Sequence, residues 1–323
     1  MIQPNPIDIS RWSRNTEFAD AYPEGARPKR IVISPSDPVQ NFIKPEWQHM
    51  FKRSAGRYPE QFWAEVIAYQ IGLMIGVPVP PAHAAYDSET GECGALIEWF
   101  YEEGEEQFVA AGYYFYQRIR NFDRKLGAQH NLLTAQQLNE EHIGDRQIYD
   151  FWSMMLFDTI IGNTDRHQDN WGYLAKVITR SKSVARRKHE KFAVKWNFAP
   201  WFDNGTSLGH EHFERKFSAW DGVALDRYIN RGQHHFRFAP DRLERVGHVE
   251  SMRFISTHNA LTKSLLLKKL KMFNPSTLSS ILCHFVTLPM PENGRLSRAR
   301  ADFIYRLTCR RVEIAMDALN GKY

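Results

Sequence analysis

The sequence has few cysteines and no segment typical of export. Cysteine occurs three times in 323 residues, at the separated positions 93, 283 and 309. The absence of any paired spacing argues against a disulfide framework and a zinc knuckle, and fits a reducing cytosol. The first ten residues lack the basic segment and apolar core of a signal peptide. We therefore expect a cytoplasmic protein.

Long uninterrupted apolar runs are also missing. Residues 66–86 carry no charge and match the length of a membrane span. However, Gly72, Gly76 and prolines at positions 78, 80 and 81 interrupt this stretch. A buried helix that ends near Gly76, followed by an extended segment, fits these residues better. We expect no membrane association.

A large excess of charge of one sign is lacking too. The chain has 42 basic and 37 acidic residues, so nucleic-acid binding is permitted but not indicated. Basic residues gather only in RSKSVARRKHEK, residues 180–191. A charge run between two strands is typical of a solvated hairpin tip, although it would also suit an acidic protein surface or RNA.

The order of predicted elements divides the chain into two parts. The first part alternates short strands with one helix, and the second is mainly helical. In the first part we expect strands in 30–34, 41–45, 77–87 and 94–100, with a helix over 58–76. In the second part we expect mainly helices across 104–160 and strands in 171–178 and 192–205. From residue 208 onward we expect mostly helices, the clearest over 296–321. This predicts an α+β fold with two lobes: a β-rich N-lobe, 1–103, and a helical C-lobe, 104–323. Such a layout is typical of kinases.

The segment GNTDRHQDNWG, residues 162–172, is unusually polar for one that follows an apolar helix. Kinases place a catalytic Asp five positions before a metal-binding Asn, and Asp165 and Asn170 have this spacing. Asp203, in FDNG, would supply the second Mg²⁺ ligand, since Mg²⁺ prefers hard oxygen donors. His167 is expected to brace this loop. Asp169 is expected to be structural.

The N-lobe should supply a cation for the ATP phosphates. Lys44 lies in the strand-like NFIKP, and Glu65 lies at the start of the next predicted helix. A strand lysine paired with a helix glutamate is the arrangement that holds an ammonium against phosphates. The connection between the lobes would then present the backbone of Glu98 to Phe100 to the adenine.

These motifs resemble those of HipA-like kinases, on the phosphatidylinositol 3/4-kinase branch of the kinase fold. NTDRHQDN resembles the catalytic loop of that family and FDNGTSLG its metal-binding segment, while FIKP with the following helix resembles its lysine strand and first helix. The resemblance covers about residues 30–210. It implies ATP- and Mg²⁺-dependent phosphorylation of serine or threonine in a protein.

The same resemblance assigns individual roles. It makes Asp165 the base, Asn170 and Asp203 the Mg²⁺ ligands, and Lys44 the phosphate contact. In this family the loop over the phosphates can carry a regulatory phosphoserine, which would be Ser34 or Ser36 in SPSDPVQ; a Ser/Pro turn without that role is the alternative. Toxin members phosphorylate targets that include aminoacyl-tRNA synthetases and bind a DNA-binding antitoxin through an extra N-terminal subdomain. Since 323 residues leave little room for that subdomain, we expect a short form, with an antitoxin-like regulator left open.

Three alternatives remain open. A metal-dependent phosphoesterase would use Asp165, His167 and Asp169, completed by HEH at 210–212 or HH at 234–235. A kinase-shaped binding or scaffold protein would have no catalytic activity, although all expected catalytic side chains are present. A lipid or small-molecule kinase would keep the chemistry and change the acceptor.

Overall fold

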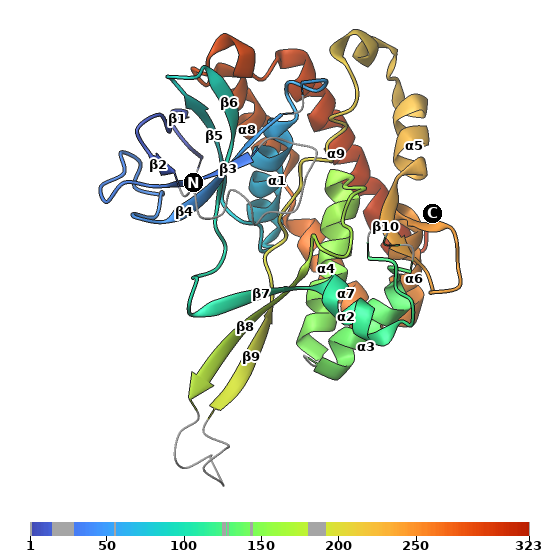
Figure 1. Cartoon of the computed structure of the whole chain (residues 1–323). Helices are drawn as coiled ribbons and strands as arrows, with labels where there is room; N and C mark the ends of the chain where they lie inside the picture. Colours follow the sequence, from blue (N-terminus) through green and yellow to red (C-terminus); the bar gives the residue numbers. More distant parts are fainter. Residues whose placement is uncertain are drawn as a thin grey trace.

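The computed structural model describes residues 2–14, 29–54, 56–124, 127, 129–142, 145–179 and 192–322. A curled sheet with one long helix against its inner face forms one part of the molecule, and a larger group of helices forms the other (Figure 1). The two parts share one continuous apolar core, which runs from the helix on the sheet into the helical part.

The sheet of the first part has six strands in the order β1-β5-β6-β4-β3-β2. Only β1 and β5 run parallel, and the other neighbours are antiparallel. Helix α1, Phe62–Ile75, packs on β5 and β6 and ends at Gly76, which adopts φ = 66°. Glycine tolerates this left-handed conformation because it has no Cβ. The strands are β1 Ile7–Asp8, β2 Ser13–Arg14, β3 Lys29–Ile33, β4 Gln48–Arg53, β5 Ala82–Asp87 and β6 Glu92–Glu98.

The strand predicted at residues 41–45 is wrong. This segment forms turns, and the strand that follows β3 is β4, Gln48–Arg53. Pro45 lacks the N–H that a ladder position requires. Instead of pairing, the segment covers the outer face of the sheet, where Ile43 is buried beside Phe51 and Phe42 packs on the same cluster. Its apolar residues therefore serve a second small core.

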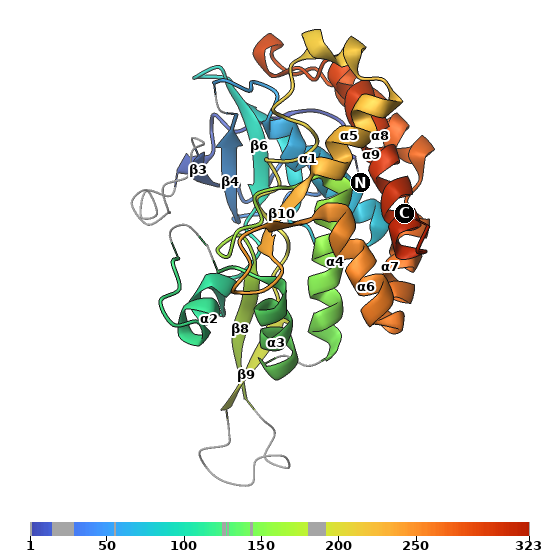
Figure 2. The same cartoon turned by 90° about the vertical axis from the view of Figure 1, so that its right-hand side faces the viewer.

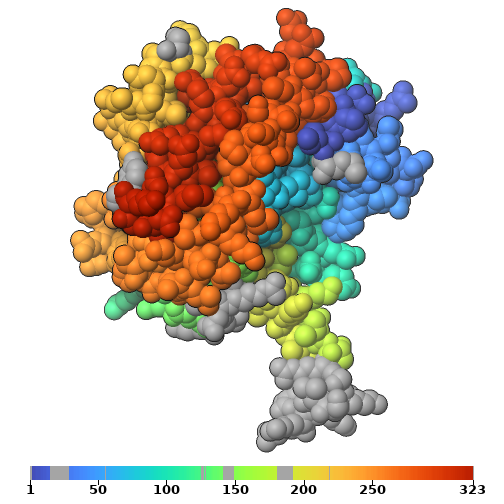
Figure 3. Space-filling model, turned by 180° about the vertical axis from the view of Figure 1, so that it is seen from behind, coloured from blue at the N-terminus to red at the C-terminus, as the bar shows by residue number. Residues whose placement is uncertain are grey.

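A second sheet projects from the molecule as a long hairpin. Its order is β7-β8-β9, formed by Glu106–Ala110, Gly172–Thr179 and Phe192–Phe198 (Figures 1 and 3). Strand β7 lies in a region predicted to be mainly helical, and its partner β8 is distant in sequence. The basic segment 180–191 lies outside the described residues.

Helices form the rest of the second part. Helix α4 is central, and the long helix α9 runs along it and beside α6 and α8 (Figure 2). In the described part of the chain, no helix combines the length and the apolar character that crossing a membrane would take. The remaining elements are α2 Ala111–Arg118, α3 Leu132–His142, α4 Asp145–Ile161, α5 Gly222–Arg231, β10 Gln233–Arg237, β11 Arg245–Gly247, α6 His248–His258, α7 Ala260–Met272, α8 Pro275–Thr287 and α9 Arg298–Leu319, with 3₁₀ turns η2 Glu214–Ala219 and η3 Glu292–Gly294.

The C-terminal helices reach back to α1 and fix it against the helical part. The Trp63 indole donates a hydrogen bond to the carbonyl of Gly294 at 3.0 Å, and its ring packs on Phe285 of α8. Near the start of α1, Arg300 pairs with Glu60 at 3.2 Å. The boundary predicted between residues 103 and 104 falls between β6 and β7, and it remains a proposal.

Candidate active site

The polar loop begins where α4 ends, at Gly162. This glycine has φ = 69°, and a Cβ there would lie 2.6 Å from the buried guanidinium of Arg311, so both conformation and space require glycine. The next residue, Asn163, connects three segments. Its Oδ1 accepts from the Asp165 N–H at 3.0 Å and from the Thr206 hydroxyl at 3.0 Å, and its carbonyl contacts the His248 ring at 3.0 Å. The loop therefore has a fixed starting point.

Internal hydrogen bonds define the conformation of the loop. The Asn170 Nδ2 donates to the Asp165 carbonyl at 2.9 Å, while the Asn170 N–H donates to the His167 carbonyl at 2.9 Å. The His167 Nδ1 accepts from the N–H of Asp169 at 3.2 Å. The structure thus brings Asp165, His167 and Asn170 together in one compact turn. The bracing role of His167 remains a prediction, and its ring forms a hydrogen bond within the loop.

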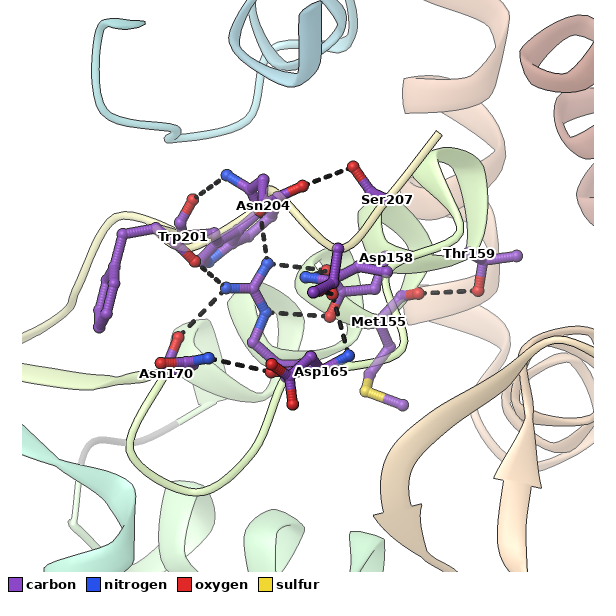
Figure 4. A network of polar contacts seen from close by, with 12 residues as sticks. Met155, Asp158, Thr159, Asp165, Asn170, Trp201, Asn204 and Ser207 are labelled. Atoms are coloured by element: carbon purple, nitrogen blue, oxygen red, sulfur yellow. Dashed lines mark hydrogen bonds and ion pairs between the residues drawn. The ribbon is translucent and has the colours of Figure 1, made fainter. Parts of the chain in front are cut away.

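Nothing in the sequence singled out Arg166, yet it bonds three segments of the site through Asp158, Asn170 and Asn204, which Figure 4 labels within one polar network. Its fully buried guanidinium pairs with Asp158 of α4, at 2.8 and 3.1 Å. It also donates to Asn204 Oδ1 at 2.7 Å and to the carbonyls of Asn170 and Phe202. A planar group with five donors can hold several acceptors in fixed directions. Arg166 therefore links the polar loop of residues 162–172 to the segment that carries Asp203.

An ion-paired trio joins the sheet to this loop. Lys52 of β4 contacts Glu65 of α1 at 2.8 Å and Asp203 at 2.5 Å. The side chains of Lys52 and Glu65 are 7% and 3% exposed, whereas that of Asp203 is 31% exposed. Glu65 also accepts from the Asn204 N–H at 2.8 Å. The trio fixes the sheet, α1 and the Asp203 turn relative to one another.

The prediction that Lys44 pairs with Glu65 is therefore wrong. Lys44 is exposed and lies over the Trp47 ring. Side chains alternate along a strand, so Phe51 faces the outer cluster and Lys52 faces α1. One feature of the sequence separates the two lysines: Lys44 is followed by a proline, whereas Lys52 is not and lies within a continuous strand.

The surroundings of Asp165 raise the pKa of its carboxyl group. Burial is the largest cause, the negative charge of Asp203 adds to it, and positive charge at His167 opposes it. The carboxylates of Asp165 and Asp203 are therefore close enough to repel one another. Asp203 has φ = 56°, a left-handed conformation that Asp tolerates better than most residues.

An aromatic cluster adjoins Asp203 on the side of the lobe connection. Phe100 stacks on Phe202 with ring centroids 5.0 Å apart, and Phe108 of β7 meets both rings edge-on. The N–H of Glu98 donates to the Pro81 carbonyl at 2.8 Å. Burial raises the pKa of Glu98, against the charge of Lys44. The ring of Phe100 thus packs on the residue next to Asp203, and an adenine contact at Glu98 and Phe100 remains a prediction.

The two candidate loop serines have different surroundings. Ser34 is buried, and its hydroxyl donates to the Lys44 carbonyl at 2.6 Å and accepts from the Trp47 N–H at 2.9 Å. Ser36 is exposed. The Ser34 hydroxyl thus joins the start of this loop to residues 44 and 47 at its end. Because Ser34 is buried and Ser36 is exposed, Ser36 is the more accessible of the pair.

The residues of the alternative phosphoesterase site are arranged differently. Asp169 pairs with Arg124 at 2.9 Å, and His210 and His212 flank Glu211. Within the described ranges, no group of three His, Cys, Asp or Glu side chains has an arrangement that could hold a metal ion.

Comparison with known proteins places this geometry in a family. No curated protein matches the sequence. Among solved structures, the chain is similar to the Helicobacter pylori proinflammatory kinase CtkA, with TM-score 0.70, 17% identity and 98% of each chain covered. Weaker likenesses are to Shewanella oneidensis MR-1 HipA, solved with HipB and operator DNA (TM-score 0.43, 14% identity, 93% of this chain and 66% of that one), and to the Golgi casein kinase (TM-score 0.44, 11% identity, 98% and 75%).

The likeness to CtkA confirms the predicted two-lobed kinase-like fold. The sequence model of the HipA-like C-terminal domain matches residues 22–253, which is most of the chain. The chain therefore belongs to the HipA-like C-terminal domain family.

Proposed function

We propose that this protein transfers the γ-phosphoryl group of ATP, with Mg²⁺, to a serine or threonine hydroxyl of a protein. The observation that carries the proposal is the trio of Lys52, Glu65 and Asp203 beside a loop that holds Asp165 and Asn170. Phosphoryl transfer needs a cation on the phosphates, oxygen ligands for the metal and a carboxylate at the acceptor. The site offers each of these groups.

The donors suit Mg²⁺. The Asn170 Nδ2 donates to the Asp165 carbonyl, and this bond does not use the side-chain oxygen of Asn170. That oxygen would be a hard ligand of the kind that Mg²⁺ prefers. Asp203 is partly exposed and supplies a carboxylate. Asn170 and Asp203 would hold the ion, which neutralises phosphate charge when bound.

The protein groups perform the remaining tasks. Lys52, held by Glu65, would contact the ATP phosphates in place of the Lys44 first predicted. Asp165 would orient the acceptor hydroxyl and take its proton, and its raised pKa makes it a better proton acceptor than an ordinary Asp. The ring of Phe100 would border the adenine. Membership of the family supports three further parts of the proposal. The protein would be cytoplasmic, its substrate would be a protein still to be identified, and an antitoxin-like protein would regulate it.

The test is incubation with γ-labelled ATP and Mg²⁺, followed by mass spectrometry for phosphoserine and phosphothreonine. Wild type is compared with Asp203→Asn and with Asp226→Asn, a matched change at an α5 carboxylate that pairs with Arg310 at 2.6 Å. We expect label in the wild type and the Asp226 variant and none in the Asp203 variant. Labelling by Asp203→Asn would contradict the proposal. So would the absence of both labelling and an ATP-induced rise in melting temperature in the wild type.

A further inference from the structure

A two-stranded ribbon lies against the catalytic loop and has no part in the proposed transfer machinery. Strand β10, labelled in Figure 2, pairs antiparallel with β11. Two contacts hold this ribbon in place. The Arg237 N–H donates to the His130 carbonyl at 2.8 Å. The His235 ring contacts the loop, with its centroid 6.0 Å from that of the His167 ring. Groups on this ribbon therefore border the loop that would receive the acceptor.

The ribbon carries two arginines opposite each other. Arg237 of β10 is the register partner of Arg245 of β11. Like charges in directly opposed positions destabilise a strand pair. In the described part of the chain, neither guanidinium forms an ion pair, and the Arg237 Nη1 donates to the Arg242 carbonyl at 3.3 Å. Arg245 is also exposed. The arrangement leaves positive charge on the surface beside the loop.

The charge of Arg245 reaches the loop itself. Burial raises the pKa of Asp165, and the positive charge of Arg245 is among the smaller contributions that oppose this rise. Burial and then the charge of Arg245 lower the pKa of His235 to about 4. His235 is consequently neutral at physiological pH, and the ribbon's positive charge there comes from its arginines.

We propose that Arg245, supported by Arg237, recognises an acidic residue next to the acceptor serine or threonine, so that the protein selects acidic peptide segments. The inference rests on the proposed function. An exposed guanidinium without a carboxylate partner can form a bidentate pair with Asp or Glu of an incoming chain. The ATP phosphates have a different cation, Lys52, which comes from β4 in the other lobe. This separation favours the acceptor peptide over the nucleotide as the partner of Arg245.

Peptide binding tests the inference without requiring catalysis. The probes are short fluorescent serine peptides, identical except for flanking Glu, Gln or Lys, and affinity for the full chain is measured by fluorescence anisotropy. The variants are Arg245→Glu, the charge-conserving Arg245→Lys, and Lys271→Glu, the same reversal at an exposed residue of α7. Phosphorylation of the same peptides is followed in parallel.

We expect the wild type and the Lys271 variant to bind the Glu peptide best. Arg245→Glu should weaken that binding about fivefold or more, since an exposed ion pair contributes up to about 1 kcal/mol and reversal adds repulsion. Arg245→Lys should retain most of it, and high salt should reduce the difference between peptides. Equal binding of the three peptides by the wild type, or an Arg245→Glu loss equal for all three, would overturn the inference. Selective binding by a protein that neither phosphorylates these peptides nor is itself labelled by ATP, and that shows no ATP-induced rise in melting temperature, would refute the proposed function and leave the acidic preference standing.

Discussion

Replacement of Lys52 by Met tests the arrangement of the site directly. The change removes an ammonium that lies 2.8 Å from Glu65 and 2.5 Å from Asp203. Glu65 is only 3% exposed, so water cannot replace the lost partner. Breaking a buried ion pair by removing one member costs about 3–5 kcal/mol. We expect a loss of unfolding free energy near the lower end, about 3 kcal/mol, because the Asn204 N–H still donates to Glu65.

The assay is urea unfolding monitored by circular dichroism, with Lys44→Met as the matched control. Lys44 is exposed over Trp47, so its replacement should cost less than about 1 kcal/mol. The double variant Lys52→Met/Glu65→Gln should regain part of the stability, since a neutral amide is less costly to bury than an unpaired carboxylate. In the kinase assay, Lys52→Met should be inactive and Lys44→Met active.

Two results would refute this reasoning. The first is a Lys52→Met loss no larger than that of Lys44→Met, which would mean that the buried pair contributes nothing. The second is a double variant as unstable as the single Lys52 variant, which would show that the isolated Glu65 carboxylate is not the cause. Loss of activity in Lys44→Met alone would restore the first assignment of the phosphate cation.

Further predictions concern the loop and its supports. Asp165→Asn should raise stability at neutral pH. Because folding raises the pKa of Asp165, the unfolded chain loses its proton first, and ionisation lowers stability as pH rises above 3.8; the gain in melting temperature should vanish in acid. Ser34→Ala should cost about 1 kcal/mol in urea unfolding and Ser36→Ala nothing measurable, and any loop phosphate found by phosphopeptide mapping should be on Ser36. Arg166→Met should cost about 3–5 kcal/mol in the same assay by leaving Asp158 buried without its cation, and near-wild-type stability would contradict that.

The polar loop was predictable because its information is local. An apolar helix, a glycine at its end and the spacing from Asp165 to Asn170 lie within one short stretch, and nearby hydrogen bonds set its conformation. Asp203 was also identifiable, since it stands in a short polar turn after a strand. The helix of Glu65 followed from its apolar spacing and from Gly76 at its end.

Only the tertiary structure decided which partners these residues meet. Lys44 and Lys52 both precede α1 in sequence, and the choice between them depended on strand pairing: residues 41–45 cover the outer face, while β4 aims Lys52 at Glu65. In the sequence, Arg166 could not be distinguished from an ordinary loop arginine. Its acceptors come from α4 and from the segment of Asp203, and these two segments are far from each other in the chain. Local spacing thus determined the polar side chains of this loop, whereas long-range packing decided that Lys52 meets Glu65 and that the buried Arg166 holds the loop in place.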